Sequence, residues 1–139
     1  MYRLLAVDYG EKNIGLALSD PLRIIAKPYL TLNNNGIDTL IQEINIIIKK
    51  ENVGKIILGL PISVAGFDTQ KTQEVRRVYE SLSESINIPI ILWDERYSTS
   101  DAKKILIEKG LSIKDSKKVI DQTAAALILT SYLKVNVNE

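Results

Sequence analysis

The order of apolar segments along the chain constrains its fold more than any other feature. Segments with the length and composition of strands occur at 3–8, 14–19, about 23–32, 55–59 and 88–94. Apolar residues at helical spacing predict helices at 37–51, about 75–86, about 99–109 and about 115–133. Three strands followed by alternating helices and strands are typical of an α/β domain, in which helices pack on a mixed sheet.

The connections predict the directions of the strands. Short turns after Asp8 and at Asp20-Pro21 favour antiparallel pairing of the first three strands. The continuous apolar strands 55–59 and 88–94 are separated by a helix, which predicts a right-handed parallel crossover. A chain of 139 residues is expected to form a single domain over 1–139.

Composition excludes several kinds of active site. The chain contains no cysteine and no histidine, so thiol nucleophiles, Ser-His-Asp triads and zinc sites built on imidazole or thiolate are excluded. Carboxylates, lysines and hydroxyls remain as reactive groups. Because hard oxygen ligands suit Mg²⁺ or Mn²⁺, a metal site in this chain is expected to consist of carboxylates.

Acidic residues stand at the ends of two predicted strands and on the last predicted helix. Asp8 ends the first strand and Asp94-Glu95 ends the last, which would place them at one edge of the sheet. Side-chain alternation puts Asp94 and Glu95 on opposite faces, so only one of them is expected to face the site. Asp121 begins a helical stripe that continues through Ala124, Ala125, Ile128 and Tyr132.

Each acid has a simpler explanation when it is taken alone. Asp8 could hydrogen-bond the turn that follows it. Asp121 could pair with Lys117 or Lys118 as a surface ion pair worth about 0.3 to 0.5 kcal/mol. Together the acids favour a bound cation, because converging carboxylates repel one another and raise one another's pKa unless positive charge offsets them. A divalent metal ion is the simplest explanation for all three.

Charge and hydropathy give weaker indications. The formal net charge is +1, so a general affinity for nucleic acid does not follow from it. Lysines concentrate between residues 103 and 118, where a solvated helix surface is the ordinary explanation.

No apolar run reaches the roughly eighteen residues of a membrane span, and the N-terminus lacks the pattern of a secretory signal. We therefore expect a cytoplasmic protein with no membrane partner.

Motifs across nearly the whole chain resemble those of the YqgF family. They are Ala6-Val-Asp-Tyr-Gly10, Lys12, Ile14-Gly15, Ser19-Asp-Pro21, Gly59-Leu-Pro61, Trp93-Asp-Glu-Arg96, Ser98-Thr99, Ile120-Asp121 and Ala124-Ala125. The family comprises bacterial RuvX-like proteins, described as Holliday-junction-resolvase-like or as pre-16S rRNA nucleases. Because the motifs occur in order and at the right separations, chance is a poor explanation for them.

The resemblance implies an RNase H-like fold with a mixed five-stranded sheet and an acidic cluster that binds Mg²⁺ or Mn²⁺. By match, Asp8, Glu95 and Asp121 are the catalytic acids and the metal ligands. It also implies a nuclease that hydrolyses phosphodiester bonds with two ions, one activating a water and the other stabilising the leaving oxygen. Phosphate contacts are then expected from Lys12, Arg96, Lys117 and Lys118.

The chain departs from the family pattern at two places. The family loop after Gly-Leu-Pro usually reads close to Asn-Met-Asp-Gly-Thr, whereas here it is Ser63-Val-Ala-Gly-Phe67. The residue after Lys12 is usually arginine, and here it is Asn13. Both changes reduce polar or basic character near the expected substrate groove. They bear on substrate contacts rather than on the metal site.

Other functional classes remain as alternatives to a nuclease. A catalytically weak nucleic-acid-binding scaffold is disfavoured because none of the three acids is lost. A sugar-kinase or actin-like ATPase is disfavoured because such enzymes enclose the nucleotide between two lobes, and 139 residues are enough for only one. The family description favours 5′-end maturation of precursor 16S rRNA, with structured RNA and precursor ribosomal particles as partners, over cleavage of branched DNA. A junction resolvase should act as a symmetric dimer, and the apolar pattern leaves both a monomer and a weak homodimer open.

Overall fold

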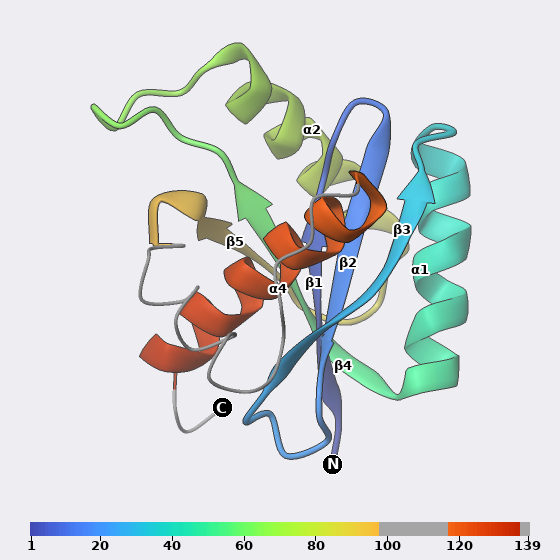
Figure 1. The fold of residues 1–139 in the computed structure, drawn as a ribbon. Coiled ribbons are helices and arrows are strands. Elements are labelled where there is room, and N and C mark those ends of the chain that lie inside the picture. The colour runs from blue at the N-terminus through green and yellow to red at the C-terminus, as the bar shows by residue number, and fades with distance from the viewer. Residues whose placement is uncertain (98–116, 137–139) are drawn as a thin grey trace.

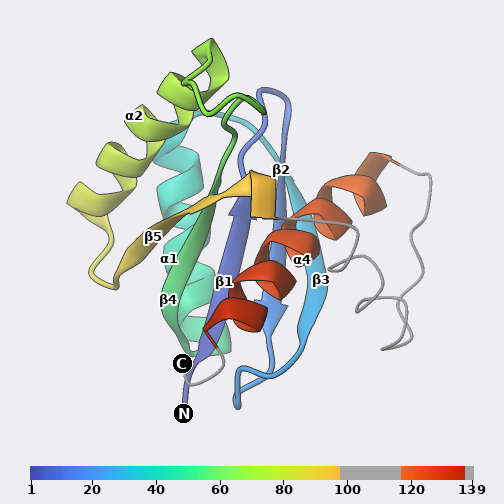
Figure 2. The same cartoon turned by 90° about the vertical axis from the view of Figure 1, so that its left-hand side faces the viewer.

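A five-stranded sheet separates two helical layers in the computed structural model, which describes residues 1–97 and 117–136 (Figure 1). In chain order the elements are β1 (Arg3–Asp8), β2 (Asn13–Ser19), β3 (Ala26–Asn33), α1 (Ile37–Glu51), β4 (Val53–Leu60), α2 (Gln70–Ser85), β5 (Ile90–Asp94), the 3₁₀ helix η1 (Glu95–Tyr97) and α4 (Lys117–Val135). The strands lie in the order β3-β2-β1-β4-β5. Helices α1 and α2 cover one face and α4 covers the other, as Figure 2 shows from the side.

The strand directions confirm the predicted mixed sheet. β1 pairs antiparallel with β2, and β2 pairs antiparallel with β3. The pairs β1–β4 and β4–β5 are parallel. Because β1, β4 and β5 run in the same direction, their carboxyl ends meet at one edge of the sheet. This is the edge where the sequence places its strand-end acids.

The predicted start of the third strand is wrong. We expected an extended segment from about residue 23, but β3 begins at Ala26. Asp20 holds the preceding segment in a turn instead, because its carboxylate accepts N–H bonds of 3.2, 2.7 and 2.8 Å from Leu22, Ile24 and Ile25. Burial tends to raise the pKa of Asp20, but these donors outweigh burial and hold the pKa below its usual value.

The first helix lies where it was predicted, and the second begins earlier than its apolar pattern indicated. α2 starts at Gln70 because Thr69 caps it. The Thr69 hydroxyl accepts the N–H of Thr72, and the Thr72 hydroxyl accepts the N–H of Thr69. The helix predicted at 99–109 lies outside the described residues. Within the described ranges, no helix is both long enough and apolar enough to cross a lipid bilayer.

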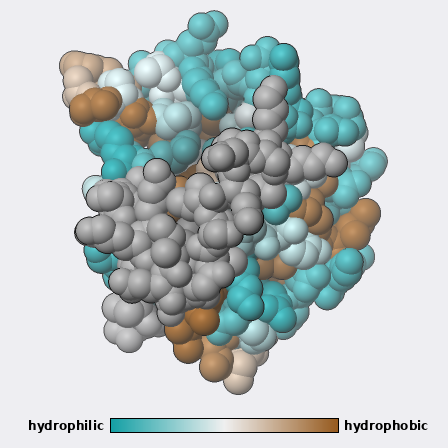
Figure 3. Space-filling view, viewed as in Figure 1, coloured by the Kyte–Doolittle hydropathy of each residue, from teal (hydrophilic) through white to brown (hydrophobic). Residues whose placement is uncertain are grey.

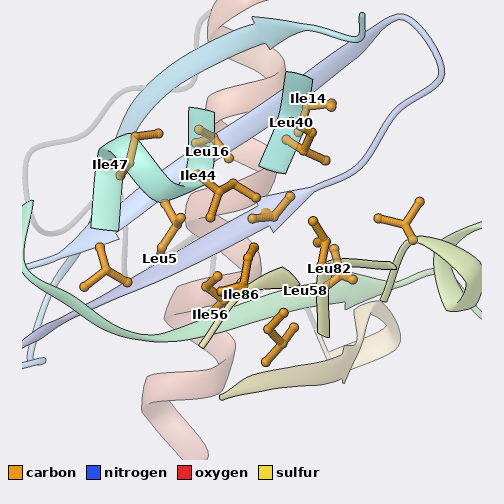
Figure 4. Packing of buried hydrophobic residues seen from close by; sticks show 14 of the residues in the cluster. Leu5, Ile14, Leu16, Leu40, Ile44, Ile47, Ile56, Leu58, Leu82 and Ile86 are labelled. Carbon is orange, nitrogen blue, oxygen red and sulfur yellow. The ribbon is translucent and has the colours of Figure 1, made fainter. Parts of the chain in front are cut away.

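The larger apolar core lies between the sheet and helices α1 and α2. Leu5, Leu16 and Leu58 point into it from the sheet, and Ile44 of α1 and Leu82 of α2 meet them from the other side (Figure 4). All five side chains are fully buried. The apolar stripes predicted on these two helices therefore face the sheet.

Small residues let α4 pack closely on the opposite face. Ala125, Ala126 and Leu129 of α4 lie against Ala6 of β1 and Ala17 of β2, and all are fully buried. The face of β2 that carries Gly15 and Ala17 is thus covered by α4. Burial of α4 extends beyond the predicted stripe to Thr123, Thr130 and Ser131.

Candidate active site

Asp8 lies at the centre of the sheet edge where β1, β4 and β5 end. It is the last residue of β1 and pairs with Gly15 of β2. On its other side lies β4, where Gly59 follows Leu58, the last residue that pairs with β1. Because side chains alternate and Ala6 packs beneath α4, Asp8 points to the face that α4 covers.

Asp121 of α4 lies directly over Gly15. A Cβ atom at Gly15 would overlap the backbone carbonyl of Asp121 and would lie 3.1 Å from the Asp121 Cβ atom. Only glycine leaves room for this close approach of helix to strand. The negative charge of Asp121 contributes to the raised pKa of Asp8, so the two carboxylates interact. The structure therefore brings Asp121 next to Asp8.

Glu95 lies over Gly59, on the other side of Asp8. A Cβ atom at Gly59 would lie 3.2 Å from both Cγ and Cδ of Glu95, and 2.6 Å from Cδ1 of Ile128. Glu95 is the first residue of η1, directly after β5. The two glycines thus stand on either side of Asp8 in neighbouring strands, and each makes room for one of the other two acids.

The neighbouring acid, Asp94, is held by Arg96. The Arg96 guanidinium donates from Nη2 and Nε to Oδ2 of Asp94 at 2.6 and 2.9 Å. This bidentate contact holds the pKa of Asp94 below its usual value. Leu92, two residues earlier in β5, packs in the core under α1 and α2, whereas Trp93 packs beneath α4. Of the two adjacent acids, Glu95 is therefore the one on the side of Asp8.

Burial dominates the electrostatics of the two inner carboxylates. It raises the pKa of Asp8 to about 6, opposed by the positive charge of Lys71 and reinforced by Asp121. Burial also raises the pKa of Glu95 to about 7. The negative charge of Asp8 adds to this rise, the positive charge of Lys71 opposes it, and the negative charge of Asp94 makes a smaller addition. The positive charge of Lys71 therefore offsets only part of the effect of burial, and a bound cation would offset more of it.

Lys71 is a charged residue of the site that reasoning from the sequence missed. It lies in the first turn of α2, just beyond the loop that follows β4. Its charge acts on both Asp8 and Glu95. The sequence feature that could have identified it is Thr69, because threonine is a preferred N-cap residue. A helix that begins after Thr69 has Lys71 in its first turn, at the carboxyl edge of the sheet. Lys71 lines a hollow of about 430 Å³ together with Glu11, Gln70, Glu74 and Arg77.

The predicted phosphate-binding residues are distributed around this edge. Lys12 is exposed in the turn between β1 and β2, and its carbonyl oxygen accepts the backbone N–H of Asn34 at 2.9 Å. Arg96 is exposed on η1. Lys117 and Lys118 begin α4, but their side chains lie outside the described part of the structure.

The donor set suits a divalent cation, although the side chains are not gathered around one point. The candidate ligands are all carboxylates, the groups that Mg²⁺ and Mn²⁺ prefer, and burial has raised the pKa of Asp8 and Glu95. Among the residues that the structure describes, no three acidic side chains lie close enough together to hold a metal ion as they stand. An ion bound here would have to draw the acids closer together.

The fold places the chain in the RNase H-like class. T. thermophilus RuvC, solved in complex with a Holliday junction substrate, superposes with a TM-score of 0.69 at 9% identity, covering 99% of this chain and 97% of that one. The yeast mitochondrial Holliday junction resolvase Ydc2 superposes with a TM-score of 0.63 at 18% identity, covering 98% and 79%. At these identities the likeness concerns the fold.

The chain belongs to the RuvX family. The family model, described as Holliday junction resolvase, matches residues 2–135. A relative from Dictyoglomus turgidum is 40% identical over 131 residues, which is 94% of this chain and 93% of that protein. One from Thermoanaerobacter pseudethanolicus is 41% identical over 138 residues, 99% of each chain. Both are named "Putative pre-16S rRNA nuclease". The resemblance found in the motifs is confirmed, and with it the assignment to the nucleases.

Proposed function

We propose that Asp8, Glu95 and Asp121 form the metal-dependent catalytic centre of an endonuclease. The observation that supports this most directly is the position of Asp8 between Gly15 and Gly59, with Asp121 over the first glycine and Glu95 over the second. If Asp8 only formed a hydrogen bond with its own turn, the two neighbouring strands would not need glycines that let other acids approach it. The absence of cysteine and histidine leaves carboxylates as the ligands available for the metal.

The three acids would divide the work of holding the cations. When bound, Mg²⁺ or Mn²⁺, two ions in this proposal, would activate a water and stabilise the leaving oxygen. Asp8 lies between the other two acids and would bind both ions. Glu95 and Asp121 would each add a ligand to the coordination shell of one ion. Ligation needs the ionised acids, and without metal the pKa is about 6 for Asp8 and about 7 for Glu95, so metal affinity should rise with pH through this range.

Cations around the acids would bind the phosphates of the substrate. Lys71 is the best placed of these, because its charge already acts on Asp8 and Glu95. Arg96 directs Nε and Nη2 at Asp94, so a phosphate contact would use its Nη1. Lys12 would contact the strand from the β1–β2 turn. Such contacts give salt-dependent affinity without sequence preference.

The favoured substrate is precursor 16S rRNA, in the cytoplasm and in association with precursor ribosomal particles. The names of the relatives at about 40% identity support this choice. The description of the family model supports a second candidate, cleavage of branched DNA. A resolvase must cut two strands symmetrically and should therefore act as a homodimer, whereas a processing nuclease can act as a monomer.

One comparison of substrates tests this proposal. Wild-type protein and the Asp8→Asn variant are incubated with single-stranded RNA, a precursor 16S rRNA fragment and a four-way DNA junction, each with Mg²⁺ or Mn²⁺. We expect the wild type to cut the precursor RNA and the variant to leave it intact.

Other outcomes would contradict parts of the proposal. Paired symmetric nicks in the junction, with the precursor RNA untouched, would identify a resolvase. If neither protein cuts any substrate, the chain is a binding scaffold. Equal cutting by both proteins would place the active site elsewhere or indicate a contaminating nuclease.

A further inference from the structure

The loop between β4 and α2 exposes two apolar side chains at a projecting tip. Val64 is 97% exposed and Phe67 is 71% exposed. The loop extends away from the sheet and helices in Figure 1, and Figure 3 shows hydrophobic atoms at its tip in the same view. Neighbouring apolar side chains on a projection indicate a contact site more strongly than single ones do. This is also the loop in which the chain departs from the polar family sequence.

Hydrogen bonds hold the tip in one shape. The backbone N–H of Ser63 donates to the carbonyl oxygen of Phe67 at 3.1 Å, and that of Gly66 donates to the carbonyl oxygen of Ser63 at 2.8 Å. The N–H of Phe67 donates to the Ser63 hydroxyl at 2.9 Å. Ile62 and Asp68 form an antiparallel bridge at the base of this turn. The ring of Phe67 is therefore presented by a preorganised turn, which lowers the entropy lost on contact.

The base of the loop is fixed to α2. The carboxylate of Asp68 accepts bonds of 2.9 and 3.1 Å from Nε and Nη2 of Arg76. The hydroxyl of Thr72 donates to the carbonyl oxygen of Pro61, where the loop begins. The loop is thus attached at both ends to elements that border the catalytic edge, rather than hanging free from them.

The loop lies beside the candidate active site and its cations. It begins two residues after Gly59, which contacts Glu95. A Cβ atom at Gly66 would lie 3.4 Å from Nη1 of Arg96, so the loop passes next to the guanidinium. At its far end the loop leads into the first turn of α2, where Lys71 acts on the catalytic acids.

We propose that Phe67 stacks on an unpaired base of the bound strand next to the cleavage position, with Val64 beside it. An exposed aromatic ring among cations is the combination that binds single-stranded nucleic acid, because the ring stacks on a base while the cations bind phosphates. Arg96, which lies next to the loop, and Lys71, whose charge acts on the acids, supply the cations. The inference rests on the proposed function, because it requires a nucleic-acid strand at the carboxylates.

Fluorescence of 2-aminopurine tests this stacking. The base is placed at successive positions of a single-stranded RNA and bound to protein that carries Asp8→Asn, so that the RNA stays intact. We expect quenching at one position, and we expect Phe67→Ala to remove it and weaken binding about 10-fold. Phe67→Trp should keep both. Ile46→Ala, which removes a 58% exposed apolar side chain from α1, is the matched control and should change neither.

The outcomes separate this inference from the proposed function. Unchanged quenching and affinity in Phe67→Ala, in a protein that still binds RNA, would overturn the inference and leave the nuclease proposal standing. A dimer that light scattering shows to dissociate in Phe67→Ala, with quenching unchanged, would also overturn it, because the ring would then contact a second copy of the chain. If the wild type neither binds nor cleaves RNA, the proposed function fails first.

Discussion

Replacement of Asp8 by asparagine is expected to abolish cleavage and, at the same time, to stabilise the fold at pH 8 in the absence of divalent metal. The loss of activity follows from the removal of the central ligand. A metal site of this kind contributes several kcal/mol of transition-state stabilisation, so we expect cleavage to fall by about 10³-fold or more.

The gain in stability follows from the raised pKa of Asp8. Its pKa is about 6 in the folded protein against an ordinary value of 3.8, so the folded state loses stability as the pH rises from about 4 to about 6, and the full loss applies above pH 6. The difference corresponds to an upper limit on the order of 3 kcal/mol. Below about pH 4 the acid is protonated in both folded and unfolded states, and the advantage of asparagine should disappear.

Chemical denaturation at pH 8 and pH 4, with and without Mn²⁺, measures this effect. Mn²⁺ should raise the free energy of unfolding of the wild type, because it binds the folded state, and should have little effect on Asp8→Asn. A variant that is less stable than the wild type at pH 8 in metal-free buffer would show that Asp8 has a structural role, which the present account does not give it.

Gly15→Ala is expected to reduce both stability and cleavage. The added methyl group would overlap the backbone carbonyl of Asp121, and a helix backbone cannot move aside as a flexible side chain can. Overpacking of this kind costs about 1–3 kcal/mol. Because α4 must shift to relieve it, Asp121 moves with the helix. A displacement of about 1 Å at a catalytic group can cost about 10²-fold in rate.

Gly59→Ala is the matched comparison in the strand on the other side of Asp8. Its methyl group would meet Cδ1 of Ile128 at 2.6 Å and the side chain of Glu95 at 3.2 Å, and both of these can rotate. We expect a smaller loss of thermal stability than for Gly15→Ala, together with reduced cleavage from the displaced Glu95. Equal thermal melts for Gly15→Ala and the wild type would refute the close packing of α4 on β2.

The parts of the site that could be predicted are those that depend on the ends and the alternation of strands. Asp8 lies at the predicted edge because a continuous apolar run ends there. Alternation along β5 correctly separated Glu95 from Asp94, even though Glu95 belongs to η1 rather than to the strand. Asp121 was predicted to begin a helical stripe that includes Ala125 and Ile128, and these two residues pack on the sheet.

The features that were missed depend on local hydrogen bonds that an apolar pattern does not reveal. The position of Lys71 depends on where α2 begins, and a pair of threonine hydroxyls sets that start five residues before the first predicted apolar position, Val75. The late start of β3 depends on the turn around Asp20. The pairing of Arg96 with Asp94 is likewise a contact within one short segment, and it leaves Arg96 only part of its donors for substrate.

The most direct test of the three-acid centre is Mn²⁺-dependent cleavage of a precursor 16S rRNA fragment by Glu95→Gln and Asp94→Asn. The two variants remove one negative charge from adjacent residues, but only Glu95 lies over Gly59 on the side of Asp8. We predict that Glu95→Gln loses cleavage by about 10³-fold and loses Mn²⁺ binding by calorimetry, whereas Asp94→Asn keeps both within about tenfold. Cleavage by Glu95→Gln at the wild-type rate, or loss of activity in Asp94→Asn alone, would contradict the account.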